Sequence, residues 1–239
     1  MVTHRIKKQL IGTITQIRMI QNSTFTFLDK LRENNNTEWF KANEEEYREA
    51  RADVISFVSE IILGLSMIDT GIQSQYLEPR KCIKRINRDI RFSLNKTPYK
   101  THFFVVFNPG GYKSEGAGYY MFIEPNGSFV GGGVYMPPTA LLNKFRKEIE
   151  HNLAEWKGIV NAPSFLKMFP KGVEASSSLK TVPRGFDIQS EAIEYLRMKG
   201  YHTIHHLSNE ELTSSDAVSL VLDAYKEVQP MVQFLNGAM

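Results

Sequence analysis

Residues 102–135 read HFFVVFNPGGYKSEGAGYYMFIEPNGSFVGGGVY, and this stretch decides the fold class. Asn126 and Gly127 form an Asn-Gly pair, which is a strong signal for a tight hairpin turn. The Asn-Pro-Gly-Gly sequence at 108–111 predicts a second reversal of the chain. Adjacent strands are therefore expected to be antiparallel. Three runs rich in aromatic and β-branched residues predict the strands themselves: 102–108, 118–124 and 128–135.

Helical periodicity precedes and follows this strand region. Apolar residues recur at helical spacing over 23–33 and over 37–65, where the pattern is interrupted near Asn43. Because helices, then strands, then helices follow one another without βαβ alternation, we predict an α+β fold. It should hold a mostly antiparallel sheet of four to five strands, packed by a long N-terminal helix and by C-terminal helices. The remaining predicted elements are a fourth strand at 81–87, helices at 139–151, 153–160, 190–198 and 209–235, and an extended stretch at 201–207.

The composition is that of a globular chain able to fill a sizeable core. It has 239 residues, 42% of them apolar, including 15 Phe and 10 Tyr. Cys82 is the single cysteine, so the chain has no intrachain disulfide and no paired-cysteine zinc site. We expect Cys82 to fill space in the core, and we expect a cytoplasmic protein, because a lone thiol fits a reducing compartment. The longest apolar run, 61–65, is far shorter than the ~20 residues that cross a bilayer, so no membrane partner is expected.

The first eighteen residues carry four Lys/Arg and no acid, on a weakly amphipathic pattern. Three interpretations stay open: a basic tail, translation that starts at Met19 instead, or an organellar targeting segment. We expect 1–20 to be a basic N-terminal extension and 21–239 to be a single α+β domain.

Positive charge is concentrated in residues 80–102, RKCIKRINRDIRFSLNKTPYKTH. Eight Lys/Arg stand against Asp89, a net charge of +7, whereas the whole chain carries +3 and the other residues therefore sum to −4. Guanidinium and ammonium groups suit phosphate and carboxylate, so the segment predicts an anion site, with a small anionic ligand as partner. The candidate ligand-binding residues are Arg85, Arg88, Arg91, Lys96, Tyr99 and Lys100, with Tyr120 on a neighbouring strand.

Two other functions remain open beside anion binding. A hydrolase or transferase acting on a phosphorylated substrate could use His102 or Asp89 as acid or base, with Glu124 as a further candidate. Alternatively, the chain is a non-catalytic interaction module whose charges form structural ion pairs. No nucleophile elbow, zinc signature or phosphate loop favours the enzyme, and neither a cofactor nor a metal is expected. Nucleic acid is a weaker choice of anion, because the pI of about 8.8 is only mildly basic.

The glycine triplet 131–133 interrupts the third predicted strand. Three adjacent glycines have a backbone entropy cost, so something is expected to approach this backbone closely. A bulge, a bulky side chain such as Trp39, or a ligand would each explain the triplet.

Three histidines lie close together near the C-terminus, His202, His205 and His206. On a strand His205 would face away from the other two, which would lie ~13 Å apart. They are therefore not expected to share a metal ion.

Five blocks of the chain stand out in order: NNNTEWFKAN (34–43), RINRDIRFSLNKTPYKTH (85–102), YYMFIEP (119–125), GGGVYMP (131–137) and LKTVPRGF (179–186). Together they resemble the DUF2461 family, and the resemblance extends over about 24–235. It implies one domain over this range and implies no particular activity.

Overall fold

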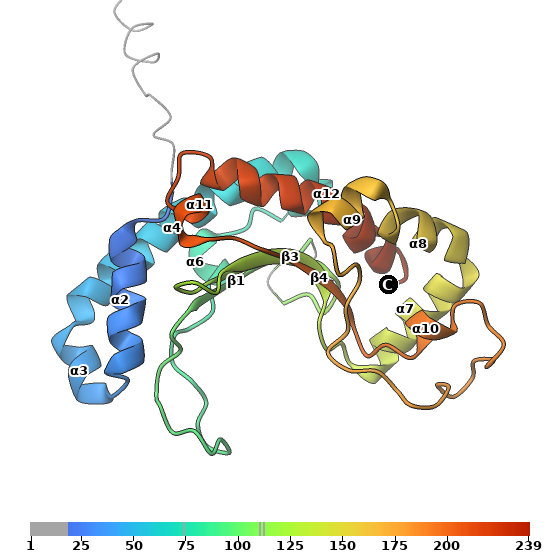
Figure 1. The fold of residues 1–239 in the computed structure, drawn as a ribbon, viewed down its shortest axis with the longest axis horizontal. Coiled ribbons are helices and arrows are strands. Elements are labelled where there is room, and N and C mark those ends of the chain that lie inside the picture. Colours follow the sequence, from blue (N-terminus) through green and yellow to red (C-terminus); the bar gives the residue numbers. More distant parts are fainter. Residues whose placement is uncertain (1–18, 74, 110, 112) are drawn as a thin grey trace, which may run out of the picture.

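The computed structural model describes residues 19–73, 75–109, 111 and 113–239. Figure 1 shows one curved sheet with helices over its convex side, which confirms the predicted α+β class. The sheet has strand order β1-β2-β3-β4 with every neighbouring pair antiparallel. All four strands coincide with predicted ones to within two residues at either end: β1 (Phe103–Phe107), β2 (Gly118–Ile123), β3 (Phe129–Val134) and β4 (Tyr201–His206).

The N-terminal helices agree with the predicted periodicity. The predicted break falls at Asn43, where one helix ends and the long helix begins. Asn36 caps the shorter of these, because its side-chain oxygen accepts a hydrogen bond from the Trp39 amide at 2.8 Å. The helices are α2 (Asn22–Glu33), α3 (Thr37–Ala42), α4 (Glu44–Ile68), α5 (Thr70–Gln73) and α6 (Pro79–Cys82).

The C-terminal helices are more divided than predicted. The expected helix at 190–198 shortens to four residues, and the expected helix at 209–235 splits into two. The first of these two helices begins after Ser208, which forms a capping box with Glu211. This helix ends at its C-cap, Thr213, and the second helix begins after Asp216. The helices are α7 (Thr139–His151), α8 (Leu153–Val160), α9 (Pro163–Met168), α10 (Ile193–Leu196), α11 (Asn209–Leu212) and α12 (Ala217–Gly237).

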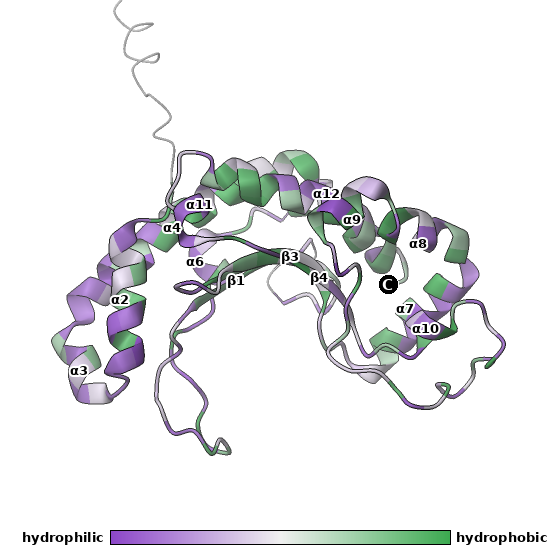
Figure 2. Ribbon diagram, in the orientation of Figure 1, coloured by the Kyte–Doolittle hydropathy of each residue, from purple (hydrophilic) through white to green (hydrophobic). Residues whose placement is uncertain are grey.

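One face of the sheet packs against α12, and α4 packs against α12 in turn. Alternate side chains of the strands point into this layer, and the buried Tyr225 hydroxyl of α12 donates a hydrogen bond to the Tyr120 carbonyl at 3.0 Å. Figure 2 shows much of α12 and of the sheet around β1 and β3 in hydrophobic colours, whereas β4, α2 and α3 carry many hydrophilic residues. The strand residues buried on this face are Phe103, Val105, Phe107, Tyr119, Met121, Ile123, Val130, Thr203 and Tyr201.

The glycine triplet lies where α12 and a tyrosine ring approach β3. A Cβ atom on Gly132 would lie 2.8 Å from a methyl group of Val228 on α12. A Cβ atom on Gly131 would collide with the Thr203 carbonyl oxygen and lie 3.0 Å from the Tyr120 ring. The proposal that Trp39 covers the triplet is wrong, because its ring instead packs 6.2 Å from that of Phe27.

The predicted strand at 81–87 is wrong. Pro79 begins the short helix α6 instead, as proline favours the first helical position. After it only isolated bridges form, Ile83 with Val105 and Asn87 with Tyr99.

Residues 84–101 form a two-legged arm that leaves the sheet on its concave side (Figure 1). Its legs are joined by backbone hydrogen bonds from Arg88 to Pro98 (2.9 Å) and from Lys100 to Ile86 (2.8 Å). Phe92 at its tip is almost fully exposed to solvent. The arm therefore holds most of the concentrated positive charge away from the core.

The domain boundary expected near residue 20 stays a prediction. Residues 1–18, on which the three interpretations of the N-terminus fall, lie outside the described residues. Ile20 is fully buried, and its amide donates a hydrogen bond to the Leu212 carbonyl at 3.0 Å. Among the helices of the described ranges, none is both long and apolar enough to cross a membrane.

Candidate functional site

The concave face of the sheet carries a row of aromatic side chains that no helix of the described ranges covers. These side chains line a hollow of about 550 Å³. The rings of Phe122 and Phe129 stack with centroids 4.9 Å apart and planes only 5° from parallel. These side chains alternate along the strands with those buried against α12, so the strand period places them on the open face. We call them the apolar floor: Phe104, Tyr120, Phe122, Phe129 and Ile204.

Tyr120 has a structural hydrogen bond within this floor. Its hydroxyl donates to the Thr203 carbonyl at 2.8 Å and lies 3.2 Å from the Gly132 carbonyl, which fixes β2 against the far strands. Burial raises the pKa of the Tyr120 phenol well above its usual value. The sequence placed Tyr120 among the ligand-binding candidates, and its ring does line the hollow.

Lys100 marks one end of the apolar floor. It lines this hollow and also a neighbouring one of about 340 Å³ that contains Arg88 and Tyr99. The Lys100 ammonium donates to the Arg85 carbonyl at 2.7 Å. Burial lowers the pKa of Lys100, and the positive charges of Arg85 and Lys84 lower it further. An anion at this point would relieve the repulsion among these cations.

His102 also lines both hollows. Its ring stacks on Phe122, with centroids 4.0 Å apart. Burial lowers the pKa of the His102 imidazole to about 4, and the positive charge of Lys100 acts in the same direction. At neutral pH His102 is therefore uncharged and can accept a hydrogen bond or a proton, but it adds no positive charge to the site.

The other candidates of the arm are held by partners within it. Arg88 lines the smaller hollow, and its guanidinium donates to the carbonyl (3.0 Å) and hydroxyl of Thr97. Arg91 lies outside both linings and forms a two-point ion pair with Asp89 at 2.7 and 3.0 Å, which lowers the pKa of Asp89. The Lys96 ammonium donates to a carbonyl of its own loop. The structure thus brings Arg88, Tyr99, Lys100, His102 and Tyr120 around the two hollows, and places Arg85, Asp89, Arg91 and Lys96 outside them.

Glu124 adjoins the cationic end without lining either hollow. Its carboxylate accepts a hydrogen bond from the Thr101 hydroxyl at 3.1 Å and lies 3.6 Å from the Arg32 guanidinium. Arg32 also pairs with Asp29 at 2.9 Å. The positive charge of Arg32 is therefore balanced by carboxylates, whereas none of the described ion pairs includes Lys100.

The opposite end of the hollow is formed by His202 and Tyr135, whose rings lie 5.1 Å apart. Burial lowers the pKa of His202, and Glu174 acts against this shift. His205 lies on the other face of β4 and contacts the Met168 carbonyl through Nδ1 at 3.0 Å. The three histidines are thus divided by the strand, as expected, and the described ranges hold no group of three or more potential metal ligands.

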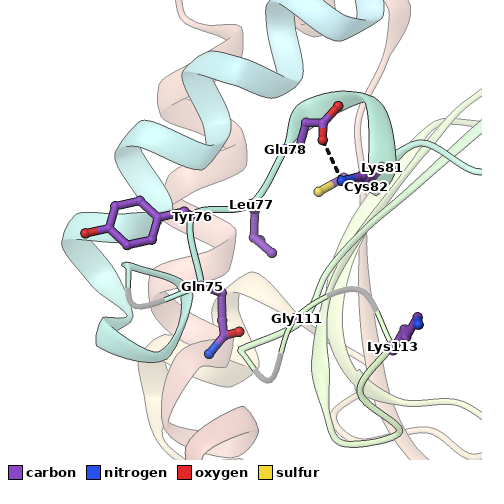
Figure 3. A pocket seen from close by; sticks show the side chains of 8 residues that line it. All are labelled: Gln75, Tyr76, Leu77, Glu78, Lys81, Cys82, Gly111 and Lys113. Carbon is purple, nitrogen blue, oxygen red and sulfur yellow. Dashed lines mark ion pairs between the residues drawn. The ribbon is translucent and has the colours of Figure 1, made fainter.

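Cys82 lies in a separate hollow of about 310 Å³ shown in Figure 3. Glu78 and Lys81 form an ion pair of 2.7 Å beside it. Burial raises the pKa of the Cys82 thiol to about 11, so the thiol stays protonated at neutral pH. This agrees with a cysteine that fills space rather than one that attacks a substrate.

Several lining residues were not predicted. Phe104, Phe122 and Phe129 look like core residues in the sequence, because both faces of their strands are apolar. Arg32 and Asn35 come from α2 and the turn after it, far from the basic segment in sequence. Asn35 connects the two regions, since its side chain forms hydrogen bonds of 2.9 and 3.1 Å with the Tyr99 backbone.

A family model, DUF2461, matches residues 23–234 and is described as a conserved hypothetical protein. The chain belongs to the DUF2461 family. The matched range contains the sheet, the arm and all residues of the two hollows, so the resemblance seen in the sequence is confirmed. The family's description names no activity. No curated protein and no solved structure gives a significant match.

Proposed function

We propose that this DUF2461 protein binds a ligand that joins an anionic group to an apolar body. The anionic group, a carboxylate or a phosphate, would lie at Lys100, and the apolar body would cover the apolar floor. The observation that carries the proposal is the meeting of the two hollows at Lys100 and His102. A cationic end therefore adjoins an uncovered apolar surface. Because the chain has one cysteine and no disulfide, the cytoplasm remains the proposed location.

The electrostatics of Lys100 support the anionic part of the ligand. Its ammonium is partly desolvated and lies near other cations, which lowers its pKa. A charge-assisted hydrogen bond in such a partly buried place is stronger than one in open water. Arg88 adds a second cation, already oriented by Thr97.

Binding is better supported than the rival hydrolase or transferase. Asp89 is engaged by Arg91 in the arm and does not line either hollow. His102 could serve as a base, but it stacks on Phe122 and has its pKa well below neutrality, whereas an efficient base at pH 7 has a pKa near 7. In favour of the interaction module are two exposed ion pairs of the basic segment, Arg91 with Asp89 and Lys81 with Glu78.

Titration with 1-anilinonaphthalene-8-sulfonate tests the proposal, because this probe combines an anion with an aromatic body and fluoresces when bound. We expect saturable binding that weakens about tenfold in Lys100→Gln, the change for loss of one charge-assisted bond of ~1.4 kcal/mol. Lys147→Gln, an exposed lysine on α7, is the matched control and should bind as the wild type does. Absence of binding, or equal weakening in both variants, would refute the proposed site.

A further inference from the structure

The hollow over the apolar floor is long as well as apolar. Its lining extends from His102 at one end to His202 at the other. The strand register places His102 level with Glu124 and His202 level with Gly118, six residues apart along β2. Six residues along a strand correspond to about 20 Å. Since β1 and β4 are three strand spacings apart, the two ends are also separated by about 14 Å across the strands. The diagonal is about 25 Å.

Along this hollow, permanent positive charge occurs only at the His102 end. Of the described residues that line the hollow, Lys100 is the only lysine or arginine. The rest of the lining is aromatic or aliphatic apart from the histidines, whose pKa values are lowered by burial at both ends. A single-stranded nucleic acid carries a phosphate at every step and is bound by cations along its whole path. The hollow instead suits a ligand with one charged head.

The charge balance at the head favours a single negative charge. Neither Lys100 nor Arg88 takes part in a described ion pair, whereas Arg32 lies against two carboxylates, those of Asp29 and Glu124. These two negative charges together offset the charges of Arg32 and Arg88, which leaves the one positive charge of Lys100. The Glu124 carboxylate beside the same end would repel a second negative charge on the ligand. A monoanionic carboxylate therefore fits this end better than a phosphate that carries nearly two charges.

We infer that the ligand is a long-chain carboxylate. Its head would lie at Lys100, and its acyl chain would extend along the apolar floor towards His202. This inference rests on the proposed function and names the ligand class of the same site.

The dimensions of the hollow agree with one acyl chain. A volume of about 550 Å³ over a length of about 25 Å gives a mean cross-section on the order of 20 Å². Carbon atoms in contact lie about 4 Å apart, so one extended chain needs roughly 15 Å². An extended chain advances roughly 1.2 Å per bond, as the protein backbone does, so a chain of about 16 to 18 carbons spans most of the length.

Displacement of 1-anilinonaphthalene-8-sulfonate by octanoate, dodecanoate and hexadecanoate, each below its micelle concentration, tests the inference. We expect the affinity to rise about twofold per added methylene, because the open hollow covers about half of each group. Hexadecanol, which has the chain without the charge, should bind at least tenfold more weakly than hexadecanoate. Hexadecyl phosphate and an oligothymidylate serve as the competing head group and the competing polyanion.

Two variants separate the head from the chain. Lys100→Gln should weaken all three carboxylates by the same factor. Tyr135→Glu places a charge at the far end, on a side chain that is more than half exposed to solvent. It should weaken hexadecanoate at least tenfold and leave octanoate unchanged, because the short chain does not reach that end. Lys147→Gln is again the control, and unchanged melting curves would show that each variant is folded.

The outcomes distinguish this inference from the proposed function. If the affinity stops rising at octanoate while the sulfonate probe still depends on Lys100, the long-chain carboxylate is refuted and the proposed function stands. If neither the probe nor any carboxylate binds, both fail. Tighter binding of hexadecyl phosphate at neutral pH, or displacement by the oligothymidylate alone, would overturn the choice of a carboxylate.

Discussion

His102 should make the protein less stable in mild acid, and the structure gives the size of the effect. Burial holds its pKa at about 4 in the folded chain, whereas an unfolded histidine titrates near 6.5. Below pH 6.5 the unfolded state therefore binds a proton that the folded state does not bind. Stability from this group is complete above pH 6.5 and is lost as the pH falls towards 4.

The full pKa difference corresponds to roughly 2 kcal/mol of lost stability at pH 5. The His102 ring is only half-buried, so solvent screening reduces the expected loss to about 1 kcal/mol. The cations Arg32, Arg88 and Lys100 line the smaller hollow together with His102, and His202 lies at the far end of the larger hollow.

His102→Phe isolates this contribution, because a phenyl ring keeps the stacking on Phe122 and cannot titrate. The measurement is the free energy of unfolding in urea at pH 7.5 and at pH 5, for both proteins. The wild type should lose about 1 kcal/mol more than the variant over this interval, and the contribution of His202 cancels in the difference. Equal losses, or a wild type that gains stability in acid relative to the variant, would refute the burial of His102 as we describe it.

Two further predictions concern the fold itself. Gly132→Val should lower the melting temperature by about 2–12 °C, because overpacking against Val228 costs about 1–3 kcal/mol. Gly158→Ala is the control and should not lower it, because a Cβ atom there meets nothing. Equal melting curves for the two variants would contradict the close approach of α12. Arg88→Ala should speed hydrogen exchange at the backbone amides of positions 88 and 100, because the side-chain bonds to Thr97 that hold the two legs of the arm together are lost. Arg91→Ala is the control and should leave the exchange of these amides unchanged. Similar exchange in both variants would contradict the assigned roles.

The architecture could be predicted from the sequence because local signals and tertiary packing agree. The Asn126–Gly127 turn fixed the β2–β3 hairpin, and the interruption at Asn43 marked the true break between two helices. The strand at 81–87 failed because its alternation of apolar and basic residues fits a leg of the arm as well as it fits a strand. The difference lies in Pro79, which begins a helix, and in the pairing of this segment, which within the described residues is limited to two isolated bridges.

The cationic end of the site was predictable, and its apolar floor was not. Lys100 and His102 stood out because charge is concentrated around them in the sequence. Phe122 and Phe129 could not be assigned to an open face, because the strands carry apolar residues on both faces and the sequence does not say which face a helix covers. The packing of α12 against Gly132 decides this, and it depends on a contact between residues almost a hundred positions apart.

The apolar floor and the cations around Lys100 adjoin each other, and each leaves a favourable interaction unmade in the free protein. Apolar surface that stays exposed to water is unfavourable, because burying it would lower the free energy. Exposed apolar patches on single chains commonly mark binding sites. Lys100 is partly buried and lies near the cations Arg85 and Lys84, and both effects lower its pKa. A helix or a second sheet could cover the floor but would bury the charge of Lys100 without a partner. A ligand with one anionic head and an apolar chain covers the floor and neutralises the charge together, which is why the two features support one site.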